Sequence, residues 1–283
     1  MNSMTNSTPS GHDTPPMIMG ILNVTPDSFS DGGRYSDTAA AVHHALAMVD
    51  EGADLIDVGG ESTRPGAQPV PAPEQERRVI PVIMRLRECM PRSTAISIDT
   101  TSARVAEAAL DGGADWINDT SAGRDDPAML ALTADRDVPI VLMHRQGMPE
   151  AMQQNPCYAD VVAEVRDFLA KRIEAALAAG IALDKILTDP GIGFGKTLEH
   201  NLALMAGLGE LVRLGPAVLL GASRKRFLSA ICREPDLTAL MPATCATTTI
   251  GVLAGVTVFR VHDVAGNRQA ADVAWAVRRA GSQ

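Results

Sequence analysis

Clusters of positive charge and aromatic side chains are both scarce in this sequence. The 283 residues include 25 Lys and Arg against 34 Asp and Glu, a formal net charge of −9, and no dense run of Lys or Arg occurs. Binding nucleic acid through its phosphates needs clustered positive charge, so no nucleic-acid partner is expected. A small anionic substrate needs only a few local cations and stays possible. Because aromatics make up 3% of the chain, the core must be built from aliphatic side chains and Met.

The sequence also lacks a secretion signal and a membrane span. Residues 1–16 contain no Lys or Arg and no apolar run, so we expect a disordered N-terminal tail there. No stretch approaches the roughly 18 uninterrupted apolar residues of a membrane helix. The four cysteines show no metal-ligand spacing and indicate reduced thiols in a cytoplasmic protein. They are Cys89, Cys157, Cys232 and Cys245.

From Met17 onward, short apolar runs alternate with longer segments of helical period. Helical spacing is clear over 38–51 and 158–179, where apolar residues recur at intervals of three and four. Glycines that would end helices are Gly52, Gly112, Gly180 and Gly215. The predicted strands are 17–23, 55–59, 95–99, 116–118, 139–143, 186–188, 217–221 and 256–261.

Strands that are each followed by helical sequence predict parallel pairing through crossovers. A doubly wound sheet is the rival, but regular units over about 250 residues favour a closed (β/α)8 TIM barrel, an α/β fold. We therefore expect one catalytic domain over 17–283. The long unit 224–255 should hold two helices, and the Pro-rich stretch 65–73 should be a loop after the second strand.

Most of the predicted strands end at or just before polar residues, whereas they begin with apolar residues. An Asp or Asn after a single strand is more often a turn former or a helix cap than a catalytic group. Capping does not predict that nearly every strand ends this way, and barrel enzymes build their sites at these ends. The polar residues are Asn23, Asp99, Asn118, Asp119, His144, Asp189, Ser223, Arg224, Lys225, Arg260 and His262.

Two kinds of ligand chemistry fit these ends. Asn23, Arg64, Arg260 and His262 would surround an anion, and the alternation of Arg260 with His262 places both on one face of the last strand. The alternative for a lone Arg is a surface ion pair. Deeper in the barrel, carboxylates and an amide would suit a ligand rich in N–H groups, such as a 2-amino-4-oxo pyrimidine edge. The alternative is that these deeper side chains form an internal salt-bridge network. That deeper set is Asp99, Asn118, Asp189 and Lys225.

The segment from Gly191 to Lys196 lacks the spacing of a nucleotide-binding loop. Its glycines instead indicate a close approach of backbone to a flat ligand, with Phe194 beside it. No metal cage is evident either. Mg2+ keeps most of its waters and binds substrate phosphates, so a single side-chain ligand such as Asn23 would suffice.

Several motifs together resemble the dihydropteroate synthase family over residues 17–280. The run from Asn23 to Gly33 is similar to the first loop of that family, and Glu61 to Gly66 to its second loop. The remaining matches follow in the family's order: Ile98 to Thr100, Ile117 to Asp119, Met143-His144, Asp189 to Lys196, Ser223 to Lys225 and Arg260 to Asp263. Thr120-Ser121, Arg145 and Ala243 to Cys245 depart from the family's usual residues.

The resemblance implies transfer of a pterin from its pyrophosphate to 4-aminobenzoate by a homodimeric enzyme that uses Mg2+. It implies a pterin site, a pyrophosphate site and a 4-aminobenzoate site, with Asp99, Lys225, Asn23, Arg260 and His262 catalytic. The implied pterin contacts are Asp99, Asn118, Met143, Asp189 and Lys225. The implied pyrophosphate contacts are Asn23, Arg64, Arg260 and His262, with Asn23 as the metal ligand. The implied 4-aminobenzoate contacts are Phe29, Thr63, Phe194 and Ser223.

The chemistry expected from this family is substitution at the pterin methylene carbon, by a dissociative route without an enzyme nucleophile. Two other functions remain open at this stage. A pterin-dependent methyltransferase would share the barrel and the carboxylates but would not need the first loop or the Ser-Arg-Lys motif. A catalytically silent pterin-binding paralogue would be expected to have lost loop residues, yet both loop motifs are complete here.

Overall fold

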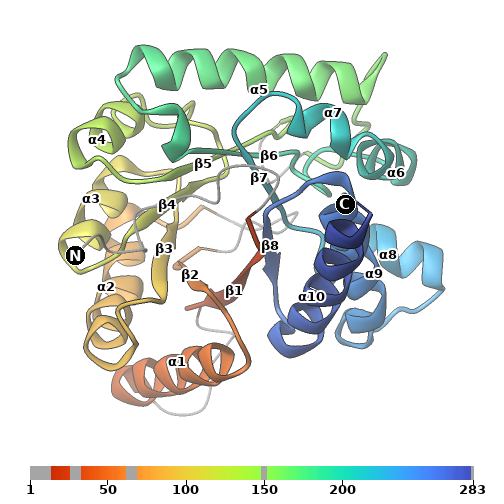
Figure 1. Cartoon of the computed structure of the whole chain (residues 1–283). Coiled ribbons are helices and arrows are strands. Elements are labelled where there is room, and N and C mark those ends of the chain that lie inside the picture. Colours follow the sequence, from red (N-terminus) through yellow and green to blue (C-terminus); the bar gives the residue numbers. More distant parts are fainter. Residues whose placement is uncertain (1–13, 26–32, 62–68, 148–151, 282–283) are drawn as a thin grey trace.

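The computed structural model describes residues 14–25, 33–61, 69–147 and 152–281, without the side chains of 33–37. Most of the predicted tail, residues 1–13, lies outside this part of the chain. Eight parallel strands close into a barrel in sequence order, which confirms the predicted fold class (Figure 1). The strands are β1 (Met17–Asn23), β2 (Leu55–Gly59), β3 (Ala95–Asp99), β4 (Trp116–Asp119), β5 (Ile140–Met143), β6 (Ile186–Asp189), β7 (Ala217–Leu220) and β8 (Val258–Val261).

Helices surround the barrel and connect its strands (Figure 1). They are α1 (Gly33–Asp50), α2 (Ala72–Cys89), α3 (Ala103–Asp111), α4 (Met129–Arg136), α5 (Val161–Ala178), α6 (Leu198–Ala206), α7 (Leu208–Val212), α8 (Arg226–Cys232), α9 (Met241–Ala254) and α10 (Val264–Ala280). Two 3-10 turns, η3 (Leu183–Lys185) and η4 (Leu237–Leu240), complete the described elements. The predicted pair of helices in 224–255 is confirmed as α8 and α9.

Two helices begin at residues that the prediction did not give, because the residue before each helix determines its first turn. The segment 158–179 becomes a helix only from Val161, because the Asp160 carboxylate accepts hydrogen bonds from Val162 N and Ala163 N at 3.0 Å each. In the Pro-rich stretch 65–73, the loop prediction is wrong for the last two residues. α2 already begins at Ala72, directly after Pro71.

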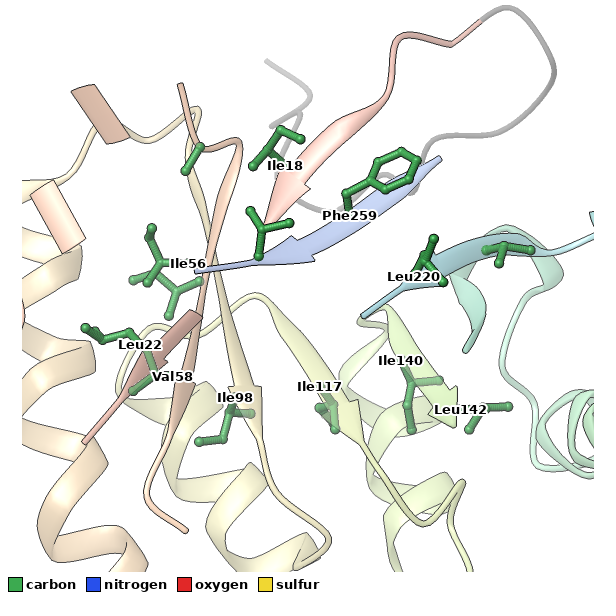
Figure 2. Packing of buried hydrophobic residues seen from close by; sticks show 14 of the residues in the cluster. Ile18, Leu22, Ile56, Val58, Ile98, Ile117, Ile140, Leu142, Leu220 and Phe259 are labelled. Atoms are coloured by element: carbon green, nitrogen blue, oxygen red, sulfur yellow. The ribbon is translucent and has the colours of Figure 1, made fainter. Parts of the chain in front are cut away.

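Strand residues alternate between two apolar layers. One set points outward under the helices and includes Ile18, Ile56, Ile98 and Ile117 (Figure 2). The other set points into the barrel and forms a separate, smaller core. Its members are Met19, Leu55, Ala95, Trp116, Val141, Leu187, Leu219 and Val258. A side chain two or four positions after one of these therefore also points into the barrel, nearer its C-terminal mouth.

One helical segment of the described chain, Leu237–Ala254, is apolar and long enough to cross a membrane by composition alone. The core helix of a globular protein passes the same test, so this is weak evidence. Here α9, which forms most of the segment, is joined to α10 by a hydrogen bond from Arg278 Nη1 to Val252 O of 3.1 Å. The absence of a membrane span stays a prediction.

Candidate active site

The barrel's alternation brings the predicted polar residues to one place. Each lies two or four positions after a member of the inner apolar core, so each side chain points into the barrel at its C-terminal mouth. Those residues are Asn23, Asp99, Asn118, Met143, Asp189 and Arg260. Met143 is 3% exposed and Asp189 is 5% exposed, so the mouth is lined by largely desolvated groups.

A carboxylate that sequence reasoning missed, Asp57 of β2, organises the centre of this mouth. It is fully buried, and its Oδ2 accepts hydrogen bonds from Arg260 Nε at 2.6 Å and from Asn118 Nδ2 at 2.9 Å. Arg260 also donates through Nη2 to Asp99 Oδ2 at 2.8 Å. The signal for Asp57 was available, because it is the one charged residue within the apolar run of β2.

The Arg260 guanidinium is thus shared by two carboxylates. These contacts raise the pKa of Arg260 against the effect of its burial, so the group stays charged. Burial raises the pKa of the Asp99 carboxyl to about 7, with Asp57 and Glu61 adding to the rise and Arg260 opposing it. The internal salt-bridge alternative, weighed above for the deeper set, therefore holds in part for Asp99, which shares the Arg260 guanidinium with Asp57 inside the barrel.

Asp189 and Lys225 form a second cluster at the mouth, on the side of β6 and β7. Burial raises the pKa of Asp189 and lowers that of Lys225 to about 8, while the attraction between the two charges opposes both shifts. A Cβ on Gly221 would lie 3.8 Å from both Asp189 Oδ2 and Lys225 Nζ. Because Gly221 has no side chain, the approach to both groups stays open. A flat ligand edge could therefore meet an acceptor and a donor side by side.

Ser223 and His262 meet between the ends of β7 and β8. Ser223 Oγ accepts the His262 backbone N–H at 3.1 Å and lies 3.0 Å from the ring nitrogen Nδ1. Arg224, the residue after Ser223, pairs with Asp263, which follows His262; its Nη2 donates to Asp263 Oδ1 at 2.6 Å. The Ser-Arg-Lys motif is therefore held against the last strand, with Lys225 turned toward Asp189.

Phe194 stands in the loop after β6, and its ring faces a cation. The Lys225 ammonium lies 4.7 Å from the ring centroid, a cation–π distance. Lys225 also donates to the carbonyl of Ile192 in the same loop. The two residues that the sequence assigned to different ligands, Phe194 and Lys225, therefore form one wall of the site.

Asn23 lies at the end of β1, opposite the end of β2. A Cβ on Gly59 would lie 3.7 Å from Asn23 Oδ1 and 3.7 Å from Asp99 Oδ2, so both oxygens face the same small space. Among the described residues, no group of three or more Asp, Glu, His or Cys could hold a metal. The Asn23 amide oxygen by itself nevertheless suits Mg2+, which takes oxygen ligands and completes its shell with waters and phosphates, whereas Asp99 Oδ2 already accepts Arg260.

Three predicted site residues, Phe29, Thr63 and Arg64, lie outside the described part of the chain. The structure does show contacts of Glu61, the first residue of the second loop motif. Glu61 Oε1 accepts the backbone N–H of Val70 at 2.9 Å, and Glu61 Oε2 accepts Gln75 Nε2 at 3.0 Å. Glu61 is thereby joined to the chain that follows residues 62–68.

A parallel barrel with carboxylates, an amide and a lysine around its C-terminal mouth defines the class: a (β/α)8-barrel enzyme that binds a flat ligand rich in N–H groups. The family model described as "Pterin binding enzyme" matches residues 19–262. The dihydropteroate synthase of Mycobacterium leprae is 46% identical over 95% of this chain and 96% of its own length. That of a Synechocystis species is 45% identical over 93% and 90%.

Solved structures agree with these relatives. Dihydropteroate synthase of Xanthomonas albilineans with 4-aminobenzoic acid matches with a TM-score of 0.88 and 46% identity, over 94% of each chain. The same organism's enzyme in complex with 7,8-dihydropteroate gives a TM-score of 0.84 and 42% identity, over 95% of each chain. The chain belongs to the pterin-binding enzyme family and, within it, to the dihydropteroate synthases.

Proposed function

We propose that this chain condenses 6-hydroxymethyl-7,8-dihydropterin pyrophosphate with 4-aminobenzoate to give 7,8-dihydropteroate and pyrophosphate, a transferase step of folate biosynthesis. The observation that carries this proposal is the group of polar side chains at the barrel mouth, formed by the buried Asp57, Asp99, Asn118 and Asp189 and the half-buried Lys225. Similar enzymes have been solved with 4-aminobenzoic acid and with 7,8-dihydropteroate, which are one substrate and the product of this reaction.

The pterin is the ligand that these buried groups fit. Its 2-amino-4-oxo edge offers adjacent N–H groups, and the Asp189 carboxylate has Oδ2 open beside Gly221 to accept them. Asn118 can accept one N–H and donate another, and Lys225 can donate to a ring carbonyl. Met143 would pack against the ring face. Buried carboxylates of this kind need such donors to offset their desolvation.

Asn23, Arg64, Arg260 and His262 are proposed to hold the pyrophosphate, with Mg2+ on Asn23. When bound, Mg2+ would supply positive charge to the phosphate oxygens. Arg260 donates to Asp57 through Nε and to Asp99 through Nη2. Only its remaining N–H groups are available to bind the pyrophosphate. Arg260 would therefore bind the anion and the two carboxylates at the same time. His262 stands at the rim, oriented by Ser223.

The reaction would proceed by dissociation. The bond between the pterin methylene carbon and the pyrophosphate oxygen breaks, and the electron pair leaves with pyrophosphate. The resulting pterin cation is stabilised by the Asp99 carboxylate. The amine nitrogen of 4-aminobenzoate then attacks the methylene carbon and loses a proton to the departing pyrophosphate or to water. Phe194 and Ser223, together with Phe29 and Thr63, would orient the arylamine for this attack.

We further propose one catalytic domain over 17–283, a homodimer, and a cytoplasmic enzyme. The barrel closes between Met17 and Val261, so no second core is needed in the described chain. The four cysteines are free thiols, which fits a reducing compartment. Exposed apolar side chains on α9 and α10 support self-association.

A turnover assay tests the proposed function directly. The enzyme is incubated with the pterin pyrophosphate, 4-aminobenzoate and Mg2+, and both dihydropteroate and pyrophosphate are measured. Equal amounts of the two products are expected, and omission of 4-aminobenzoate should suppress dihydropteroate. A protein that binds the pterin yet forms no dihydropteroate would instead be a silent pterin-binding member of the family.

A further inference from the structure

The loop between β6 and α6 is held by an unusual set of hydrogen bonds. Its consecutive carbonyls of Ile192, Gly193, Phe194 and Gly195 each accept a hydrogen bond from a different side chain. In the same order, the donors are Lys225, Gln153, Lys196 and Tyr158. Gly193 N also donates to Asn201 Oδ1 at 2.7 Å. This loop, residues 190–197, is therefore fixed from several elements at once.

Lys196 is the deepest of these donors. It is 3% exposed, and its Nζ lies 3.0 Å from Phe194 O and 3.0 Å from His144 Nδ1 at the end of β5. Burial lowers the pKa of His144 to about 2, so the ring is neutral and Nδ1 can accept the proton of Lys196. The His144 ring is set in turn by Phe168, whose ring lies edge-on with centroids 4.8 Å apart.

A buried ammonium is costly unless its hydrogen bonds are made. Burial lowers the pKa of Lys196 to about 7; the positive charge of Lys225 adds to this effect, and the Asp189 carboxylate opposes it. Lys196 is thus within electrostatic reach of Asp189 and Lys225, two of the proposed pterin contacts. Among the donors to this loop, it joins the Phe194 backbone most directly to the interior of the site.

The loop also has no freedom to move toward β5. A Cβ on Gly191 would lie 1.8 Å from His144 O, and a Cβ on Gly195 would lie 2.4 Å from Gln146 O. Both glycines have positive φ, at +66° and +64°. The loop backbone is therefore pressed against the segment that carries His144, and the contact of Lys196 with His144 fixes this packing on its inner side.

We propose that Lys196 is a positioning residue for the arylamine site, acting with His144 to hold the Phe194 backbone so that the Phe194 ring and Lys225 form a fixed wall. This inference rests on the proposed function and deepens it. It assigns to Lys196 no contact with substrate. Without the Lys196 ammonium, the Phe194 carbonyl and His144 Nδ1 lose their partner, and the ring that orients 4-aminobenzoate is less well placed.

Steady-state kinetics on Lys196→Met test this role. We expect the KM for 4-aminobenzoate to rise at least tenfold, while kcat and the affinity for the pterin change less than threefold. A lysine that merely stabilised the fold would not produce such a split. Lys171→Met, at an exposed position of α5, is the matched control and should leave all constants unchanged. Lys196→Gln, whose amide can still donate to one acceptor, should recover part of the lost affinity.

Tyr158→Phe gives a second test should Lys196→Met not fold. It removes only the hydroxyl that donates to Gly195 O at 2.8 Å, and it should raise the KM for 4-aminobenzoate two- to fivefold in a folded protein. Unchanged KM values in a folded Lys196→Met, or in Tyr158→Phe if the first variant is lost, would overturn the proposal. Absence of turnover in the unaltered enzyme would instead count against the proposed function, so the two failures are distinguishable.

Discussion

Asp57, Asp99 and Arg260 show why the site depends on contacts that no single strand reveals. Arg260 of β8 bonds to Asp57 on β2 and Asp99 on β3, partners 203 and 161 residues away. Strand alternation predicts that all three side chains point inward, but it does not predict which of them meet. The sequence therefore indicated Arg260 as an anion-binding residue, whereas the structure shows that it also pairs with two buried carboxylates.

Arg260→Met should destabilise the protein in a manner that depends on pH. Removing one partner of a buried ion pair costs about 3–5 kcal/mol when the remaining charge is kept. In the folded state the pKa of Asp99 is raised to about 7. Protonated Asp99 therefore contributes stability that is fully present below the unfolded pKa. This stability is lost as the pH rises through the folded pKa. Without Arg260 the folded pKa of Asp99 rises further.

The difference in unfolding free energy between Arg260→Met and the unaltered protein should therefore be nearly constant as the pH approaches 7 from below, and grow as the pH rises above about 7, the folded pKa of Asp99 in the unaltered protein. Chemical denaturation at several pH values measures it, with Arg166→Met on the exposed face of α5 as control. A pH-independent difference would contradict the coupling of Arg260 to Asp99.

Asp189→Asn should weaken pterin binding without loss of the fold. In the unaltered protein, Asp189 Oδ1 accepts the Gly191 N–H at 2.7 Å, and the Asn oxygen of the variant can still accept it. The NH2 group of the Asn side chain would then face the N–H edge of the ligand. We expect at least a tenfold loss of affinity, about 1.4 kcal/mol. Calorimetric titration with the pterin measures it, and Asp135→Asn on exposed α4 serves as the matched control. Equal affinity for the pterin would place the N–H edge elsewhere.

The strands and helices were predictable to different degrees. Each strand is a short buried run that is mostly apolar, so its bounds are visible in the sequence to within two residues. The first residue of a helix depends on the residue that precedes it, such as Asp160 before α5 and Pro71 before α2. The spacing of apolar residues does not reveal these positions. The spacing of the loop from Gly191 to Lys196 predicted only that it is not a nucleotide motif. Its bonds to His144, Tyr158 and Lys225 join separate elements and leave no local pattern.

The opposite end of the barrel is closed by a repeated arrangement of carboxylates just before strands. Asp54, before β2, accepts Ile18 N at 2.7 Å, and Asp115, before β4, accepts Ile96 N at 2.8 Å. Asp115 also pairs with Arg87 of α2. Burial raises the pKa of both carboxyls, against these hydrogen bonds. These groups tie neighbouring strands and a helix together far from the catalytic mouth.

Asp115→Ala should therefore lower stability without changing catalysis. It leaves Ile96 N and Arg87 Nη2 without the carboxylate that accepts from them, at a cost of about 1–3 kcal/mol, while Arg87 Nε keeps its bond to Gly113 O. Asp111→Ala, which removes an exposed pair with Arg136, should cost less than about 1 kcal/mol. Thermal unfolding compares the two variants, and the turnover assay should show equal kcat. A large loss of kcat in folded Asp115→Ala would mean that the two ends of the barrel are coupled.

The whole molecule exposes apolar side chains on α9 and α10. Leu253 is 51% exposed, and Val273 and Val277 are 66% and 60% exposed. The C-terminal turns of the two helices are joined by the bond from Arg278 to Val252 O, so these side chains lie on neighbouring turns. Exposed apolar area of this kind is typical of a contact between copies.

If the proposed homodimer uses this surface, Val273→Asp should convert the protein to a monomer, because a two-fold contact places the new charge in the interface on both subunits. Sedimentation equilibrium should then show the mass of one chain, 29.8 kDa, where the unaltered protein shows twice that mass. Leu177→Asp on α5, where Leu177 is 44% exposed, is the control and should leave the dimer intact. Because the proposed pterin contacts come from strands and loops of one barrel in the described chain, the Val273→Asp monomer should retain pterin binding. A dimer that survives Val273→Asp would place the contact on another face, and a monomeric unaltered protein would refute the proposed assembly.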